Sequence, residues 1–245
     1  MKICLFPFRS ASSRVIYNVM ANSLVDLGHT LVEHAVAELV IAIRDFSKMT
    51  KRYSDKKYIL FQIEQYVRKA SFIDGLYQSE PDEIWGFDID NESEIYTPLG
   101  YHPCLQFTTF LPKDVDVGFM GWQHGRRNTW RAVVRNKWTV LNTFDDAIRE
   151  ENITRARINL NIHFREGSMF TEWGRIAYFL ANTQFFISET FHCSIAVPQF
   201  DSPAMYDGMV DHYLTYPEER EQRAREMTQS YKLDFDMRDI LKSRL

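Results

Sequence analysis

The sequence is poor in the features that mark disulfide-bonded, metal-binding and membrane proteins. It has three cysteines in 245 residues, Cys4, Cys104 and Cys193, and no CxxC pair. This number and spacing argue against a disulfide framework and a zinc site, and they are typical of a reducing compartment. No apolar run reaches the roughly 18 residues that a membrane-spanning helix needs, and the first residues do not resemble a signal peptide. We therefore expect a cytoplasmic protein with no membrane span.

An excess of positive charge is also missing. The chain carries 29 Lys and Arg against 33 Asp and Glu, a net charge of −4, whereas a nucleic-acid coat protein is normally basic. Low-complexity segments and internal repeats are absent as well. The 45% hydrophobic and 25% charged residues are usual for globular proteins, and the length suits one large domain or two small ones.

Short apolar runs alternate with helix-like segments along the first half of the chain. The run KICLFPF at 2–8 predicts a buried strand. Apolar residues at helical spacing predict a helix over 14–27, with Val15, Ile16, Val19, Met20 and Leu24 on one face. Further strands are predicted at 30–33, 38–43, 58–63, 83–87 and 96–100, and a further helix over 65–76.

A second series of the same kind follows a Pro-containing linker near 109–116. It predicts strands at 115–120, 138–141, 158–162 and 184–187, and helices at 126–135, 145–155, 170–181 and 216–231. Strands that alternate with helices form mostly parallel sheets. We therefore predict an α/β protein with an N-terminal Rossmann-like domain (1–112), a C-terminal one (113–232) and a tail helix (233–245). The two domains are expected to face a central cleft that holds the ligand.

The most informative stretch is Ile158–Glu189, which reads as strand, polar loop, helix and strand. Glu172 stands near the helix start, where a carboxylate can accept hydrogen bonds from a ribose diol and backbone amides can receive phosphate oxygens. Arg175, one turn later, can pair with Glu172 or reach a phosphate. Spacing alone leaves a second interpretation open, in which Glu172 only favours the helix start and Arg175 neutralises it.

A basic helix start follows the first strand of the second series. Gly121 allows a sharp turn after that strand, and Arg126 and Arg127 open the next helix. The helix dipole disfavours positive charge at this position, and guanidinium groups match the geometry of a diphosphate. These two arginines are therefore candidate diphosphate ligands, although a solvated basic helix start is the alternative.

The ordered series of motifs resembles the GT-B glycosyltransferases, and in particular their small spore-protein-like group. The resemblance runs over roughly residues 1–232 and includes segments 83–87, 96–103 and 211–227. It implies that Glu172 holds the donor ribose and that Glu166 approaches the donor sugar. Two departures are visible: five residues separate Glu166 from Glu172 where the wide motif has seven, and Asn182 replaces a glycine. The residues that carry the main match are Asn161, Ile162, His163, Glu166, Phe170, Glu172, Arg175, Ala177, Leu180, Ala181, Asn182, Ser188 and Glu189.

The resemblance implies transfer of a sugar from a nucleoside-diphosphate sugar, with a UDP-sugar favoured, to a hydroxyl group. Arg126 and Arg127 would hold the diphosphate, and Arg127 would stabilise it as it leaves. Glu64 is a candidate base for the acceptor hydroxyl, with a purely structural carboxylate at the strand end as the alternative. His163 is a further candidate cleft residue, in contact with the donor sugar in place of Glu166. No bound cofactor or metal is expected. The rival interpretation is a non-catalytic nucleotide-binding or interaction protein that keeps the fold, which the shortened glutamate spacing supports.

The acceptor is the least defined part of this prediction. A saccharide, a small molecule and a hydroxymethylated DNA base all remain open. The short chain is typical of a compact viral or phage member of the group, which would work in the host cytoplasm. Two basic faces are options for binding DNA, although such faces are more often simply solvated. The candidate residues are Arg126, Arg127, Arg131, Arg135 and Lys137 for one face and Lys48, Lys51, Arg52, Lys56 and Lys57 for the other.

Overall fold

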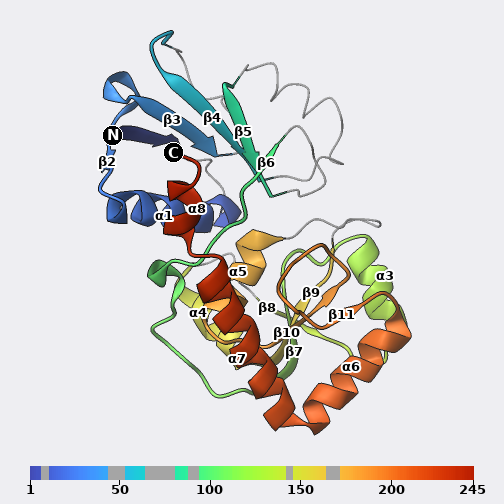
Figure 1. Cartoon of the computed structure of the whole chain (residues 1–245). Coiled ribbons are helices and arrows are strands. Elements are labelled where there is room, and N and C mark those ends of the chain that lie inside the picture. Colours follow the sequence, from blue (N-terminus) through green and yellow to red (C-terminus); the bar gives the residue numbers. More distant parts are fainter. Residues whose placement is uncertain (7–10, 44–52, 64–80, 88–93, 142–145, 164–171) are drawn as a thin grey trace. The chain divides into compact units, whose positions relative to one another are not determined.

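The structure is a computed structural model of the chain, and it describes residues 1–6, 11–43, 53–63, 81–87, 94–141, 146–163 and 172–245 (Figure 1). The chain forms two compact units. The first consists of residues 1–104 together with 235–245, and the second consists of residues 105–234. None of the helices in these described ranges has the length and apolar character to cross a membrane.

The first unit is built on a six-stranded sheet in which every neighbouring pair is parallel. Its order is β2-β1-β3-β4-β5-β6. All five residues of β3, LVIAI, are buried, as expected of a central strand covered on both faces. The strands are β1 (Lys2–Phe6), β2 (Thr30–Leu31), β3 (Leu39–Ile43), β4 (Lys57–Gln62), β5 (Glu83–Gly86) and β6 (Ile95–Tyr96).

Two helices from opposite ends of the chain pack together in this unit. Helix α1 (Ala11–Asp26) buries the apolar stripe that the sequence predicts at 15–24. Helix α8 (Met237–Lys242) lies beside it, so the last residues of the chain return to the first unit (Figure 1). The amide of Tyr101 donates to the carbonyl of Phe235, and the amide of Met237 donates to the carbonyl of Tyr101. A side chain at Gly100 would stand 2.4 Å from the Phe235 carbonyl, so this close approach requires glycine.

The second unit holds a five-stranded parallel sheet in the order β11-β10-β9-β7-β8. Its strands are β7 (Val115–Met120), β8 (Thr139–Leu141), β9 (Ala156–Asn161), β10 (Phe186–Glu189) and β11 (Gln199–Phe200). Its helices are α3 (Arg126–Val133), α4 (Asp146–Arg155), α5 (Trp173–Ala181), α6 (Pro203–Thr215) and α7 (Pro217–Asp234). Two parallel sheets with helices between their strands confirm the predicted α/β fold class.

The sequence interpretation did not include α6 or the short strand β11. The sequence does carry a signal for α6, since a serine followed by a proline is typical of a helix start. In the structure, Ser202 accepts a hydrogen bond from the amide of Met205, and Pro203 occupies the first turn. The predicted helix over 65–76 lies outside the described residues.

Asn182, which replaces the glycine of the resembled motif, has a structural role at the end of α5. Its side-chain oxygen accepts from the amide of Phe107 at 2.6 Å. Its amide nitrogen donates to the carbonyls of Leu105 and Tyr178, both at 2.8 Å. Asn182 therefore ties the first residues of the second unit to α5, which a glycine could not do.

Two glycines of the second unit give opposite stability predictions. In β7, a Cβ at Gly118 would stand 2.6 Å from Leu141 Cδ1 and 2.8 Å from Ala156 Cβ. We expect Gly118→Val to lower the free energy of unfolding by about 1–3 kcal/mol through overpacking. In α6, a Cβ at Gly208 meets no atom within 4 Å, so Gly208→Ala is expected to raise it by about 0.5–1 kcal/mol. Urea unfolding measures both, and a Gly118→Val protein as stable as the unsubstituted one would contradict this packing.

Candidate functional site

Three neighbouring strands of the second sheet end at the same edge. The parallel register places Phe119 of β7 opposite Leu160 of β9, and Asn161 of β9 opposite Ser188 of β10. The segments that follow these strands therefore lie together, and helices α3 and α5 begin near them. Ligands of open α/β sheets bind at the carboxyl ends of the strands. This edge is the candidate site.

Gly121 makes room for the site immediately after β7. Its φ of +150° is rarely adopted by residues with a side chain. A Cβ there would stand 3.1 Å from Arg175 Nη2 and 3.1 Å from the ring of Phe119. The guanidinium carbon of Arg175 lies 5.3 Å from the centre of that ring. Gly121 thus lets an arginine from α5 lie close to the backbone after β7.

The side chain of Arg127 is buried, and its guanidinium faces the protein. Nε and Nη2 donate to the carbonyl of Ile162 at 3.1 and 2.7 Å, and Nη1 donates to the carbonyl of Trp122 at 3.1 Å. Nη2 also lies 3.4 Å from Glu172 Oε1. Burial lowers the pKa of Arg127, and the nearby charge of Arg175 adds to this effect. Arg127 therefore joins the end of β9, the loop after β7 and the start of α5.

Arg126, its neighbour in α3, forms a two-pronged ion pair with Glu189 at the end of β10. One nitrogen, Nη1, donates to Glu189 Oε2 at 2.8 Å, and Nη2 contacts Oε1. Nη1 also lies 3.3 Å from the carbonyl oxygen of His163. The side chain of Arg126 is 19% exposed, against 4% for Arg127. Arg126 is thus the more accessible of the two arginines at the start of α3.

Glu172 lies at the N-terminus of α5 within a group of basic side chains. Its Oε2 contacts Arg175 Nη2 at 2.6 Å, and Arg175 Nη1 donates to the side-chain oxygen of Asn161 at 2.7 Å. Burial by itself would raise the pKa of Glu172, but the charge of Arg175, together with His163 and Arg127, lowers it to about 2. The carboxylate is therefore ionised at neutral pH and acts as a hydrogen-bond acceptor.

His163 follows β9 and is held from both sides. Its amide donates to Glu189 Oε2 at 3.0 Å, and its Nε2 lies 3.0 Å from the carbonyl oxygen of Thr190. Its Nδ1 lies 3.8 Å from Glu172 Oε1. The histidine is 1% exposed, so it belongs to the interior of the site.

The charges of the described residues at this edge leave a positive balance. Three arginines face two glutamates, and every one of these five side chains is in an ion pair with another. An anionic ligand would meet guanidinium groups that are already oriented. Such a site suits a phosphate-bearing ligand better than a cationic one.

The structure brings together six of the residues that the sequence predicts for the site: Gly121, Arg126, Arg127, His163, Glu172 and Arg175. Glu64 and Glu166 lie outside the described residues. No role was predicted for Glu189 or Asn161, although both belong to the matched motifs. Their positions could have indicated a role in the site, because each is a polar residue at the end of a predominantly buried strand.

The suggested basic face does not form as one surface. Arg126 and Arg127 are directed into the site described above. Arg135 pairs with Asp211, and Lys137 donates to the carbonyls of Arg131, Ala132 and Val134 at the end of α3. Intramolecular partners therefore take up most of the positive charge of the face around α3. In the other candidate face, Lys56 and Lys57 also have intramolecular partners, and positions 48, 51 and 52 lie outside the described residues.

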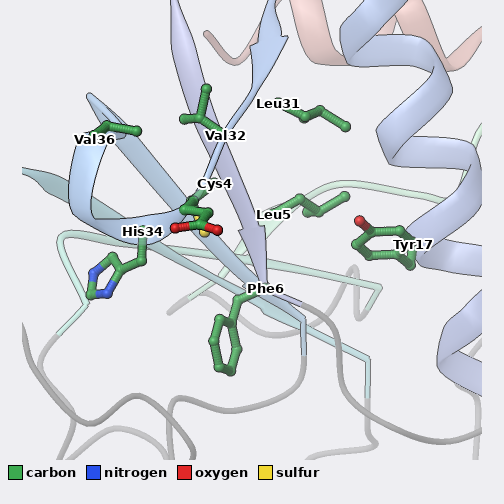
Figure 2. A pocket seen from close by; sticks show the side chains of 9 residues that line it. Cys4, Leu5, Phe6, Tyr17, Leu31, Val32, His34 and Val36 are labelled. Carbon is green, nitrogen blue, oxygen red and sulfur yellow. The ribbon is translucent and has the colours of Figure 1, made fainter.

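A separate cavity of about 720 Å³ lies in the first unit, around the carboxyl half of β1. Figure 2 shows Leu31 and Tyr17 on one side of β1 and His34 and Val36 on the other. Its walls are largely apolar, and their polar groups include the Tyr17 hydroxyl. The size is within the usual range for small-ligand sites. The lining residues are Cys4, Leu5, Phe6, Tyr17, Leu31, Val32, Glu33, His34 and Val36.

Comparison with known proteins supports the fold. No family model matches the chain, and no curated protein matches its sequence. Among solved structures, the chain is similar to the DNA-modifying enzyme β-glucosyltransferase, whose substrate is uridine diphosphoglucose, with 10% identity over 99% of both chains and a TM-score of 0.58. It is also similar to spinosyn rhamnosyltransferase in complex with thymidine diphosphate, with 7% identity over 100% of both chains and a TM-score of 0.51. At these identities the likeness shows the fold alone, which is of the GT-B type.

The different placement of the two adjacent arginines gives a stability prediction. Arg127→Met leaves the buried carbonyl of Ile162 and the part-buried carbonyl of Trp122 without this donor and removes a charge beside Glu172, so we expect a loss of about 2–4 kcal/mol in the free energy of unfolding. Arg126→Met, the matched control, is expected to lose less, about 1 kcal/mol, because the Arg126 side chain is more exposed than that of Arg127. Urea unfolding at pH 7 compares them. Equal losses would show that Arg127 does not hold these segments together.

The lowered pKa of Glu172 predicts a specific acid sensitivity. A carboxylate with a folded-state pKa of about 2, against an ordinary value of 4.5, stabilises the native state above pH 4.5. That contribution, of the order of 3 kcal/mol, is lost as the pH falls from 4.5 to 2. The stability difference between the unsubstituted protein and Glu172→Gln should therefore shrink over this range. Urea unfolding at several pH values tests this, with Glu221→Gln, an exposed carboxylate of α7, as the control. A constant difference would contradict the ion pairs of Glu172.

Proposed function

We propose that this protein is a glycosyltransferase that uses a nucleoside-diphosphate sugar, with a UDP-sugar favoured, and transfers the sugar to a hydroxyl group. The observation that carries the proposal is the cluster of Arg126, Arg127, Arg175, Glu172 and Glu189 at the carboxyl edge of the second sheet. It combines a net positive charge with an ionised carboxylate at a helix start. The GT-B fold along the whole chain agrees with this function.

Each side chain of the cluster suits one part of the donor. Glu172 is an acceptor at the start of α5 and suits the hydroxyl groups of a ribose. Arg126, the more accessible arginine, suits the diphosphate, and Arg175 is close enough to Glu172 to share that role. Arg127 is bound to carbonyl groups of the protein, so we assign it the positioning of Trp122, Ile162 and Glu172. His163 would contact the donor from the end of β9.

The reaction then needs little covalent chemistry from the protein. The acceptor hydroxyl oxygen attacks the anomeric carbon, the bond from that carbon to the diphosphate oxygen breaks, and the diphosphate leaves with the electron pair. Preorganised guanidinium groups stabilise the charge that develops on the leaving group. The acceptor proton passes to a base, for which Glu64 remains the prediction. Glu166 likewise remains the predicted ligand of the donor sugar.

We assign the acceptor to the first unit. The cavity around β1 suits a hydroxyl compound with an apolar face, because its walls are largely apolar and carry the Tyr17 hydroxyl, Glu33 and His34. Saccharides, small molecules and hydroxymethylated DNA bases are the candidate classes. The likeness to a DNA-modifying glucosyltransferase, together with the compact chain, keeps a phage DNA-modification role among them.

The first experiment is a thermal-shift panel with UDP, GDP, ADP, CMP, TDP and their common sugar conjugates. A ligand at 100 times its dissociation constant stabilises the native state by about 2.7 kcal/mol, which for a chain of this size raises Tm by roughly 5–10 °C. We expect a uridine conjugate to produce the largest shift. Glu172→Ala should abolish that shift, and Glu221→Ala should leave it intact.

Two outcomes would count against the proposal. A folded protein that responds to none of these compounds would remove the donor site. A shift that persists in Glu172→Ala would move the site away from α5. Binding without transfer to any acceptor class and without donor hydrolysis would favour the rival function, a nucleotide-binding protein that keeps the fold.

A further inference from the structure

Trp122, in the loop between β7 and α3, is the tryptophan that the fold leaves open to solvent. It is 68% exposed, whereas three of the other tryptophans are at most 1% exposed and Trp130 is half-buried beneath the guanidinium of Arg126. The indole of Trp122 has no hydrogen bond and no ring contact within the described part of the chain. Its flat apolar face and its N–H group are therefore both available to a ligand.

The loop that carries Trp122 is fixed by side chains around it. The carbonyl of Trp122 accepts a hydrogen bond from Arg127 Nη1 at 3.1 Å. The next residue, Gln123, accepts from the indole N–H of Trp138 at 2.9 Å and donates to the side-chain oxygen of Asn128 at 3.0 Å. Because the backbone around Trp122 is already held, a ligand that covers the indole has little loop entropy to overcome.

The position of this loop determines which part of the donor lies beside it. Gly121 comes just before Trp122, and a Cβ there would stand 3.1 Å from Arg175 Nη2. Arg126 comes just after the loop, at the start of α3. The proposed function assigns both of these arginines to the diphosphate. A nucleoside-diphosphate sugar has two organic groups next to its diphosphate, the ribose and the transferred sugar. Glu172 is assigned to the ribose, so the group that is left for Trp122 is the sugar.

A pyranose ring matches an exposed indole in its chemistry. Its C–H groups form apolar patches that can pack on an aromatic face, and its hydroxyl oxygens can accept a hydrogen bond from the indole N–H. We propose that Trp122 forms the donor-sugar subsite and packs its indole against the transferred pyranose. This inference rests on the proposed function and deepens it, because it names a residue that distinguishes the sugar-loaded donor from the bare nucleoside diphosphate.

The test measures binding of UDP-glucose and of UDP by isothermal titration calorimetry. Trp122→Ala is expected to bind UDP-glucose roughly three- to thirty-fold more weakly, the loss that corresponds to partial coverage of an indole face. It should bind UDP as the unsubstituted protein does. Trp122→Phe keeps an aromatic face and should recover most of the loss. Phe110→Ala is the matched control, because Phe110 is 60% exposed and precedes β7, and it should bind both compounds unchanged.

Quenching of tryptophan fluorescence by acrylamide gives a second readout. Acrylamide quenches exposed indoles most strongly, so Trp122 should dominate the quenching of the unliganded protein. UDP-glucose should protect this fluorescence from acrylamide, and UDP should not. The protection should be absent in Trp122→Phe and present in Phe110→Ala.

The outcomes separate the sugar subsite from the proposed function. Equal weakening of UDP and UDP-glucose in Trp122→Ala would place the indole at the nucleotide and overturn the subsite. Unchanged binding of UDP-glucose by this variant would also overturn it, and in both cases the donor site would stand. Binding of neither compound by the unsubstituted protein would overturn the donor site and the subsite together. Since Trp122 is exposed, its substitution should leave the fold intact, which urea unfolding of each variant checks.

Discussion

The guanidinium of Arg127 lies inside the second unit and holds three separate segments in place. It donates to the carbonyls of Ile162 and Trp122, and it approaches Glu172 at the start of α5. Trp122 belongs to the connection after β7, whereas Ile162 and Glu172 belong to the two ends of the loop between β9 and α5, so no interaction local in sequence could fix their relative positions. A buried guanidinium is tolerated only when its N–H groups have hydrogen-bond acceptors. Here the acceptors are the carbonyl of Ile162 after β9 and the carbonyl of Trp122 after β7. The geometry of the site therefore depends on a residue that is itself turned away from solvent.

The remaining charges are organised around this arginine. Arg126 pairs with Glu189, and Arg175 pairs with Glu172 and with Asn161. Because each cation has a partner before any ligand arrives, the guanidinium groups are oriented at little further entropic cost. The lowered pKa of Glu172 has the same origin, since the charges of Arg175 and Arg127 outweigh the effect of its burial. Glu172 thus remains ionised and acts as a hydrogen-bond acceptor among these basic groups.

The parallel sheet explains how residues so far apart in the sequence share one edge. Every strand of a parallel sheet ends on the same side, so the residues after β7, β9 and β10 meet although about 70 positions separate the first from the last. Two solved glycosyltransferases share the overall fold at 10% and 7% identity. A fold of this kind tolerates extensive substitution because different apolar side chains can fill the same core between the sheet and its helices. Such a likeness shows the fold alone, and the chemistry must come from the residues that line this edge in the present chain.

The sequence by itself determined the alternation of strands and helices and hence the α/β fold class, because apolar periodicity is a local property. The site residues that it named stay a prediction, drawn from polar residues at strand ends and helix starts. It predicted Glu172 and Arg175 as neighbours from their spacing in a helix, and the structure places them in contact. It could not separate Arg126 from Arg127, because which guanidinium is buried depends on the carbonyls that β9 and the turn after β7 present to it. Nor could it show the pairing of Glu189 with Arg126, or the distance of 3.8 Å between His163 and Glu172. These depend on contacts between strands that are distant in sequence, and only the tertiary structure decides them.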